Sequence, residues 1–172
     1  EYGRQNTEVV MLLHGGGLSW WNYQGVAQKL AERYQVVLPV LDGHAGSDAP
    51  FTTIEDNAAA LISYIDTCFG GQILAIGGLS LGGQIAVEMF SAKPAGYYDA
   101  ILMDVQMPVM NGYEAARAIR AMDRPYAKEI PIVAMTANAF ADDVLKCRQA
   151  GMNEHIAKPF HVEDLTRVLR AY

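Results

Sequence analysis

Short, continuously apolar runs alternate along this chain with longer stretches in which apolar residues recur every three or four positions. The short runs are typical of strands buried on both faces, and the longer stretches are typical of helices. Strict alternation of the two predicts a parallel sheet that is covered by helices on both faces. The runs that we interpret as strands are residues 8–13, 35–41, 73–76, 100–104, 130–135 and 155–157.

From this alternation we expect one compact, doubly wound α/β domain over residues 1–172, with three layers (α/β/α). Counting strands along the chain, the expected order of the six-stranded parallel sheet is 2-1-3-4-5-6. Pro39 favours an edge position for the second strand, because proline cannot donate to a ladder. Ligands of such sheets bind beyond the carboxyl ends of the strands. The polar residues that fall at those ends are His14, Asp42, Ser80, Asp104, Thr136 and Lys158.

Charge and hydropathy exclude several classes of partner. The formal net charge is −6, whereas nucleic-acid-binding proteins normally display a basic face. No apolar run approaches the roughly 20 residues of a membrane span. Cys68 and Cys147 lack the spacing of metal ligands, and we interpret both as buried free thiols. We therefore expect a soluble cytoplasmic monomer that is suited to recombinant expression and binds no partner, nucleic acid or membrane.

The run at 73–76 leads into Gly-Leu-Ser-Leu-Gly at 78–82 and then into a helical pattern. A serine in such a turn can be a nucleophile, and the flanking glycines avoid clashes between strand and helix. His-Gly-Gly-Gly stands upstream at 14–17. With these motifs, residues 1–95 resemble the first half of an α/β-hydrolase. The resemblance implies Ser80 as nucleophile and Gly15, Gly16 and Leu81 as the surroundings of an oxyanion hole.

A hydrolase triad also needs an acid and a histidine, and in this family both come from later strands. Ser80, Asp104 and His161 follow the family's chain order, but His161 is more simply the cap of the last helix. His44 lies on a loop and is interpreted as a solvated or locally bonded residue. Without a base, a serine hydroxyl is a poor nucleophile at neutral pH. We therefore interpret the elbow as vestigial; any activity would be that of a carboxylic-ester hydrolase.

Three motifs in the second half form a separate pattern. They are Met-Asp-Val-Gln-Met-Pro-Val-Met-Asn-Gly at 103–112, Ala-Met-Thr-Ala at 134–137 and Ala-Lys-Pro-Phe at 157–160. In their order and spacing, residues 96–172 resemble the back half of a response-regulator receiver domain, which is flavodoxin-like (CheY-like). The resemblance implies Asp104 as phosphoacceptor, Thr136 as the switch hydroxyl and Lys158 as the group that contacts the phosphoryl group.

Receivers use Mg²⁺, which two acidic residues at the end of a neighbouring strand help to hold. Here the expected neighbour ends in Gly-Gly-Leu-Ser at 77–80, so the acidic pair is absent. We expect no metal site and no cofactor, apart from weak Mg²⁺ binding by Asp104 and the Gln106 carbonyl. We favour an ion pair between Asp104 and Lys158 over a phosphorylatable site, and place Ser80 and Asp104 on adjacent strand ends.

Taken together, these motifs suggest an engineered or recombined chimera of the two families, joined near residues 92–98. Each half would carry a site that needs groups from the half left out, so we expect no enzyme and no selected activity. Two alternatives stay open, a weak serine esterase through Ser80 and a residual aspartate phosphoacceptor through Asp104. If both halves share one core, unfolding should be a single cooperative transition.

Overall fold

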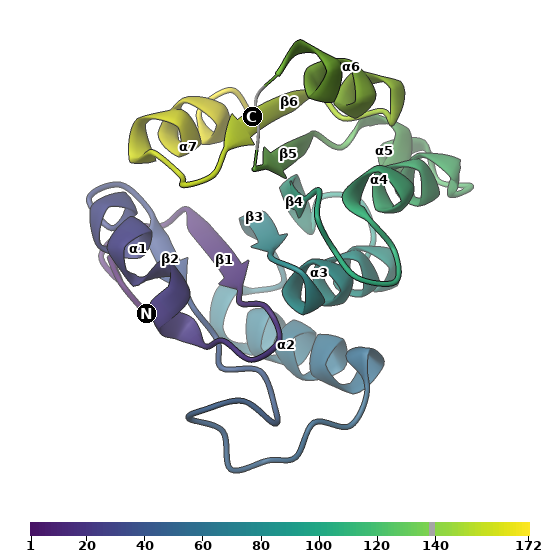
Figure 1. Cartoon of the computed structure of the whole chain (residues 1–172). Coiled ribbons are helices and arrows are strands. Elements are labelled where there is room, and N and C mark those ends of the chain that lie inside the picture. The colour runs from purple at the N-terminus through teal and green to yellow at the C-terminus, as the bar shows by residue number, and fades with distance from the viewer. Residues whose placement is uncertain (138–139) are drawn as a thin grey trace.

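The strands form one six-stranded, all-parallel sheet in the order β2-β1-β3-β4-β5-β6, in a computed structural model that describes residues 1–137 and 140–172 (Figure 1). Both the α/β class and the strand order were predicted correctly. The strands are β1 (Val9–Leu13), β2 (Gln35–Val37), β3 (Ile73–Gly78), β4 (Tyr98–Asp104), β5 (Ile132–Thr136) and β6 (Glu154–Ala157).

Helices cover both faces of this sheet (Figure 1). One face carries α2 (Ile54–Phe69), α3 (Leu81–Ala92), α4 (Gly112–Ala121), α5 (Pro125–Glu129) and α6 (Ala141–Gln149). The other carries the 3-10 helix η1 (Trp20–Tyr23), α1 (Gln24–Leu30) and α7 (Val162–Leu169). Helices from the two ends of the chain therefore pack together on one face.

Side chains of the central strand β4 alternate between the two hydrophobic clusters, as they must in a strand whose faces are both covered. Ile101 and Met103 belong to the cluster under α2–α6, and Ala100 and Leu102 to the cluster under α1 and α7. All four are at most 1% exposed. The continuously apolar sequence of this strand thus reflects burial on both faces.

Some local expectations differ from the structure. Strand β2 ends at Val37, so the predicted strand was four residues too long (37 against 41), and the segment around Pro39 leaves the ladder. The short helix α5 has Pro125 at its start, where proline's missing N–H costs nothing. Cys147 is buried but Cys68 is exposed, which corrects our interpretation of Cys68.

Strands β3 and β4, from the two halves distinguished by sequence, pair directly from Ile73 beside Tyr98 to Gly78 beside Met103. Glycine at position 77 makes this pairing close. A Cβ there would lie 2.6 Å from the Leu102 Cβ, too near for any real contact. The two strands therefore fit without a gap at this position.

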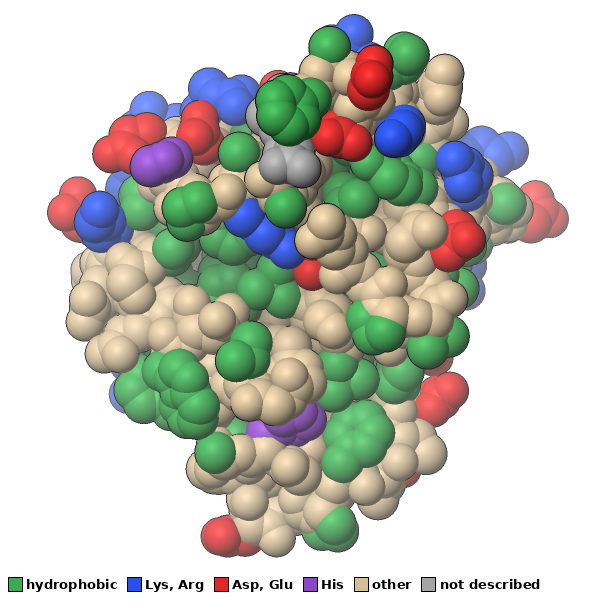
Figure 2. Space-filling view, in the orientation of Figure 1, with side chains coloured by type: hydrophobic (Ala, Val, Ile, Leu, Met, Phe, Trp, Pro, Cys, Tyr) green, Lys and Arg blue, Asp and Glu red, His purple; other side chains and the backbone are tan. Residues whose placement is uncertain are grey.

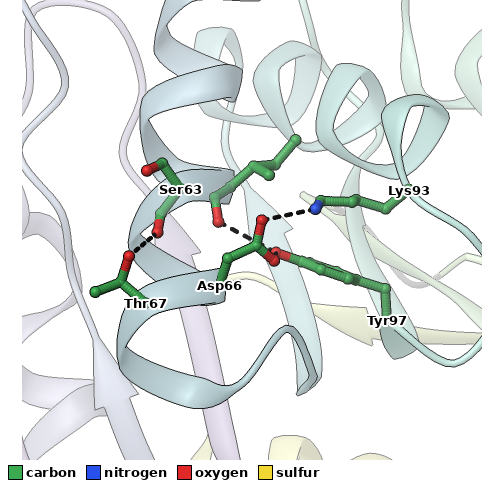
Figure 3. A network of polar contacts seen from close by, with 6 residues as sticks. Ser63, Asp66, Thr67, Lys93 and Tyr97 are labelled. Atoms are coloured by element: carbon green, nitrogen blue, oxygen red, sulfur yellow. Dashed lines mark hydrogen bonds and ion pairs between the residues drawn. The ribbon is translucent and has the colours of Figure 1, made fainter.

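The connection that leads into β4 is held by a polar network on α2 (Figure 3). Lys93 Nζ lies 2.8 Å from Asp66 Oδ2, and the Tyr97 hydroxyl donates to Asp66 Oδ1 at 2.8 Å. Lys93 also lies over the Tyr97 ring, 4.5 Å from its centre. The lysine and the tyrosine hydroxyl together lower the pKa of the Asp66 carboxyl.

Acidic and basic side chains are interspersed on the face of the molecule shown in Figure 2. Within residues 1–137 and 140–172, no helix has both the length and the apolar character that crossing a membrane requires.

Candidate functional site at the carboxyl edge of the sheet

The ends of β3 and β4 meet at the carboxyl edge through a hydrogen bond. The backbone N–H of Ser80 donates to Asp104 Oδ2 at 3.1 Å. The two residues singled out in the two halves of the sequence are therefore in direct contact. The bond joins the main chain of Ser80, not its hydroxyl, to the carboxylate.

The turn that carries Ser80 has the geometry of a nucleophile elbow. Ser80 has φ 51° and ψ −115°, a left-handed conformation that non-glycine residues rarely adopt. A Cβ on Gly78 would lie 2.2 Å from the Gly82 carbonyl carbon, and one on Gly82 would lie 2.4 Å from the Leu13 oxygen. Strand β3, helix α3 and strand β1 therefore approach so closely that only glycine fits on either side of the serine.

The groups of the expected oxyanion hole lie around this elbow. A Cβ on Gly15 would contact the Ser80 Cβ at 3.4 Å, so this loop abuts the serine, whereas Gly16 is exposed and has open space around it. Leu81 begins α3, and within the described part of the chain its N–H has no acceptor. The geometry thus places Gly15 and Leu81 near Ser80 and Gly16 at the periphery.

No histidine among the described residues hydrogen-bonds to the Ser80 hydroxyl. His14 is fully buried; Leu41 N–H donates to its Nε2 at 3.1 Å, and its Nδ1 lies 2.9 Å from the Gly15 oxygen. This pattern requires a neutral ring with its proton on Nδ1, and burial lowers the pKa of His14. The other histidine of interest, His161, is the N-cap residue of α7. Among the described residues, the Ser80 turn therefore has no histidine positioned as a base.

Asp104, in contrast, is surrounded by donors. It is 3% exposed, and Lys158 Nζ lies 2.6 Å from its Oδ1. Gln106 N–H donates to the same oxygen at 3.0 Å, and Ser80 N–H donates to Oδ2. Three donors from three segments therefore hold the carboxylate in place.

Thr136 ends β5, the strand between Asp104 and Lys158. It is 4% exposed, and its carbonyl accepts a hydrogen bond from Lys158 N–H at 2.7 Å. The peptide bond after Lys158, to Pro159, is cis. Asp104, Thr136 and Lys158, which lie far apart in the sequence, are thus brought to the ends of three neighbouring strands, β4, β5 and β6.

The donors at this edge do not fit a resident Mg²⁺ ion, which takes six oxygen ligands in near-octahedral geometry and is usually bound through carboxylates. Asp104 provides a carboxylate at this edge, and both of its oxygens already accept hydrogen bonds. The described residues contain no group of three or more His, Cys, Asp or Glu side chains that could hold a metal. Asp42 is remote, at the far side of β1 and β3 from Asp104.

Tyr23 is a residue of this region that no sequence motif singles out. It is 1% exposed, and its ring stacks on Phe160 at 6.4 Å between centres. Its hydroxyl has no partner among the described residues. Burial, and to a smaller extent the charge of Asp104, raises the pKa of Tyr23. The backbone donors of Ser80 and Gln106 were also missed, because no side-chain motif encodes them.

The fold and this edge define a doubly wound domain with an aspartate, a hydroxyl residue and a lysine on neighbouring strand ends. The family model described as "Response regulator receiver domain" matches residues 53–170. The chain therefore belongs to the response-regulator receiver family.

Curated relatives match between about a third and two thirds of the chain. The chain is 36% identical over 93 residues to hybrid signal transduction histidine kinase L of Dictyostelium discoideum, covering 54% of this chain and 5% of that protein. It is 34% identical over 119 residues to the sensor protein GacS of Pseudomonas syringae, covering 67% of this chain and 12% of that protein. The chain thus spans only a small part of these relatives.

Solved structures of two kinds share the fold. The receiver domain of a sensor histidine kinase from Pseudomonas aeruginosa, with a magnesium ion in its active-site cleft, is 27% identical (TM-score 0.50, 96% of each chain). An esterase from Thermogutta terrifontis superposes with a TM-score of 0.63 at 15% identity, over 95% of this chain and 87% of that one. The esterase likeness shows the fold alone.

These matches correct our interpretation of the chain as an engineered or recombined product without selected activity. The family match runs from residue 53 to 170, across the expected junction near residues 92–98, and the relatives are signal-transduction proteins. That interpretation is therefore wrong, and the chain is a signal-transduction domain. Receiver domains are in general not enzymes, and the ester-hydrolase alternative gains no support from the family match.

Proposed function

We propose that this chain is the phosphoacceptor module of a signalling protein and that Asp104 receives the phosphoryl group. The observation that carries the proposal is the buried Asp104 carboxylate, which lies 2.6 Å from Lys158 at the edge where ligands of such sheets bind. Family membership and the names of the histidine-kinase relatives support it.

In the proposed reaction, a carboxylate oxygen of Asp104 attacks the phosphorus of a phosphodonor. A new phosphorus–oxygen bond forms, the donor's bond to phosphorus breaks, and the donor leaves with that electron pair. Lys158 is the group suited to the charge of the transferred phosphoryl group, because an ammonium has three donors and only one faces Asp104 Oδ1. Thr136, on the strand between them, is the proposed switch hydroxyl.

The partner that this function requires is a phosphodonor. The relatives named as histidine kinases suggest a phosphorylated histidine, within the same protein or in another chain. Beyond that donor, a monomer without a nucleic-acid or membrane partner stays our prediction. With a single carboxylate at the site, we propose that any Mg²⁺ bound at Asp104 is bound weakly.

We also propose that residues 1–95 keep the shape of the first half of an α/β-hydrolase within one compact domain of residues 1–172. The strained Ser80 turn and the adjacent Gly15 support this view. Ser80, Gly15, Gly16 and Leu81 would then be vestiges of a nucleophile and an oxyanion hole. Because β3 and β4 pair directly, the domain should unfold in one transition by both circular dichroism and tryptophan fluorescence.

Intact-protein mass spectrometry after incubation with a small acyl phosphate tests the proposed function. We expect the mass of one phosphoryl group to be added, and Asp104→Asn to abolish the addition. Asp99→Asn, at the opposite end of the same strand, is the matched control and should be phosphorylated like the parent. An unchanged mass of the parent, or equal addition to Asp104→Asn, would contradict the proposal.

A further inference from the structure

Leu79 is the residue that directly follows β3, where the next position of β4 is Asp104. Gly78 pairs with Met103 in a parallel register, so Leu79 and Asp104 are the next residues along the two strands. Leu79 packs against the same cluster as Leu102, on the α1 and α7 face, and Asp104 follows Leu102 by two residues. Alternate residues of a strand share a face, so continuing this register places Leu79 on the same face of the sheet as Asp104.

An apolar side chain therefore occupies the position from which a neighbouring strand could supply a second carboxylate. The next residue, Ser80, contributes an N–H donor to Asp104 Oδ2. A hydrogen-bond donor at this place cannot coordinate a cation, because Mg²⁺ requires oxygen ligands. The end of β3 is thus suited to a negative neighbour and not to a positive ion.

The charge of Asp104 is already compensated without a metal. Lys158 Nζ and Gln106 N–H share one oxygen, and Ser80 N–H takes the other. A divalent cation at Oδ1 would have to displace one of its two donors, and a cation at Oδ2 would have to share that oxygen with the Ser80 N–H; at either oxygen it would meet the positive charge of Lys158. Such displacement leaves a buried polar group without its partner, which is unfavourable.

We infer that Lys158 and the backbone amides of Ser80 and Gln106 replace the divalent cation at Asp104, and that Leu79 is the residue that excludes the metal. The exclusion of the metal does not depend on the proposed function. Only its consequence for phosphoryl transfer rests on the proposed function. That consequence is phosphorylation of Asp104 that does not depend on Mg²⁺.

The amide signals of Ser80 and Gln106 in ¹H–¹⁵N NMR spectra report directly on the inference, since both amides donate to Asp104. During titration of the parent protein with Mg²⁺ to millimolar concentrations, we expect neither signal to shift. Paramagnetic Mn²⁺, used as a second probe, should leave both signals unbroadened at stoichiometric concentration. A saturable shift, or selective broadening of these two signals, would overturn the inference.

A gain of binding tests the role of Leu79. Leu79→Asp places a second carboxylate beside Asp104, and we expect it to bind Mg²⁺ roughly tenfold or more tightly than the parent, from the added attraction of one charge. Leu79→Asn, of similar shape but neutral, is the matched control and should bind no better than the parent. A folded Leu79→Asp protein without this gain would refute the role of Leu79. If both variants fail to fold, titration of the parent still decides the inference.

Phosphorylation with and without a chelator separates this inference from the proposed function. Equal mass addition in Mg²⁺ and in EDTA is expected, and a requirement for Mg²⁺ would contradict the inference. If no phosphate is added under either condition, the proposed function fails. The NMR titration would then still show whether Asp104 excludes the metal.

Discussion

The ends of β3 and β4 lie side by side but are stabilised in opposite ways. At the end of β3, Ser80 is held by backbone geometry, in a strained conformation between two glycines that admit no side chain. At the end of β4, Asp104 is in an ordinary strand position and is held by three donors. The first is determined by close packing and the second by charge and hydrogen bonds.

The two residues therefore depend on their surroundings in different ways. A strained turn can persist as long as the strands and helix around it pack, whether or not a base is present. A buried carboxylate needs compensation in the same structure, because an unpaired buried charge is strongly unfavourable. The Ser80 turn can therefore persist without a base, whereas the buried carboxylate of Asp104 depends on Lys158 for compensation of its charge.

The largest effect should come from filling the space beside the elbow. Gly82→Ala places a Cβ 2.4 Å from the Leu13 oxygen, and neither backbone can move easily. We expect the free energy of unfolding to fall by about 3 kcal/mol, the upper end for overpacked sites, as measured by urea denaturation. Gly25→Ala is the control, since nothing lies within 4 Å of its Cβ and it lies in helix α1. It should stabilise the protein by about 0.5–1 kcal/mol. An equal, small effect of both substitutions would contradict the packing argument.

Removing the partner of Asp104 should have the next largest effect. Lys158→Met leaves a carboxylate that is 3% exposed with only its backbone donors. Because Lys158 itself is partly exposed, we expect a loss of about 2–3 kcal/mol, below the range for a fully buried pair. Lys93→Met, which removes the ion pair with the more exposed Asp66, should cost less than Lys158→Met. If chemical denaturation gives the same loss for both variants, Asp104 does not depend on Lys158 in the way proposed.

Relief of strain at Ser80 should have a smaller effect, of opposite sign. Glycine adopts a positive φ without strain, so Ser80→Gly should raise the free energy of unfolding. Glycine also gains conformational entropy in the unfolded chain, which offsets part of this gain, and we expect a net increase of about 1 kcal/mol. Ser80→Ala keeps the strain and should change it little. Denaturation curves for the two variants make the comparison; a Gly variant no more stable than the Ala variant would argue against stored strain.

The smallest effect concerns the loop beside Ser80 and depends on pH. Burial lowers the pKa of His14 below 6.5, so the unfolded chain takes up a proton there before the folded chain does. The stability from neutral His14 is present above pH 6.5 and is lost as the pH falls below it. His14→Gln should flatten the pH dependence of unfolding between pH 7 and 5 by at most about 1.4 kcal/mol per pH unit. The exposed His161, changed in the same way, is the control, and an unchanged slope for His14→Gln would refute this prediction.

Several features of this edge were accessible from the sequence because they depend on local geometry. The elbow glycines were recognised because a strand that turns directly into a helix leaves no room for a Cβ at 78 and 82. The order of the strands followed from the alternation and from Pro39. Features of this kind are set by residues close together in the chain.

The interpretation of function failed for a different reason. The missing acidic pair and the missing base were read as signs of a product without selected activity, although the family match includes the region in question. An incomplete set of known site residues says what a site lacks. It does not show which other groups contact the residues that remain, and the backbone amides of Ser80 and Gln106, which donate to Asp104, belong to no side-chain motif.

By itself, the sequence determined the layered α/β fold, the order of the strands and the edge at which Ser80, Asp104, Thr136 and Lys158 gather. Periodicity and glycine placement carry that information, because they record burial and backbone conformation residue by residue. Only the tertiary structure decided that Asp104 meets the Ser80 amide, that Leu79 follows β3 at the level of Asp104, and that the Tyr23 hydroxyl is buried with no partner among residues 1–137 and 140–172. These contacts depend on the register between strands and on how the terminal helices pack, and main-chain donors leave no mark in a sequence motif.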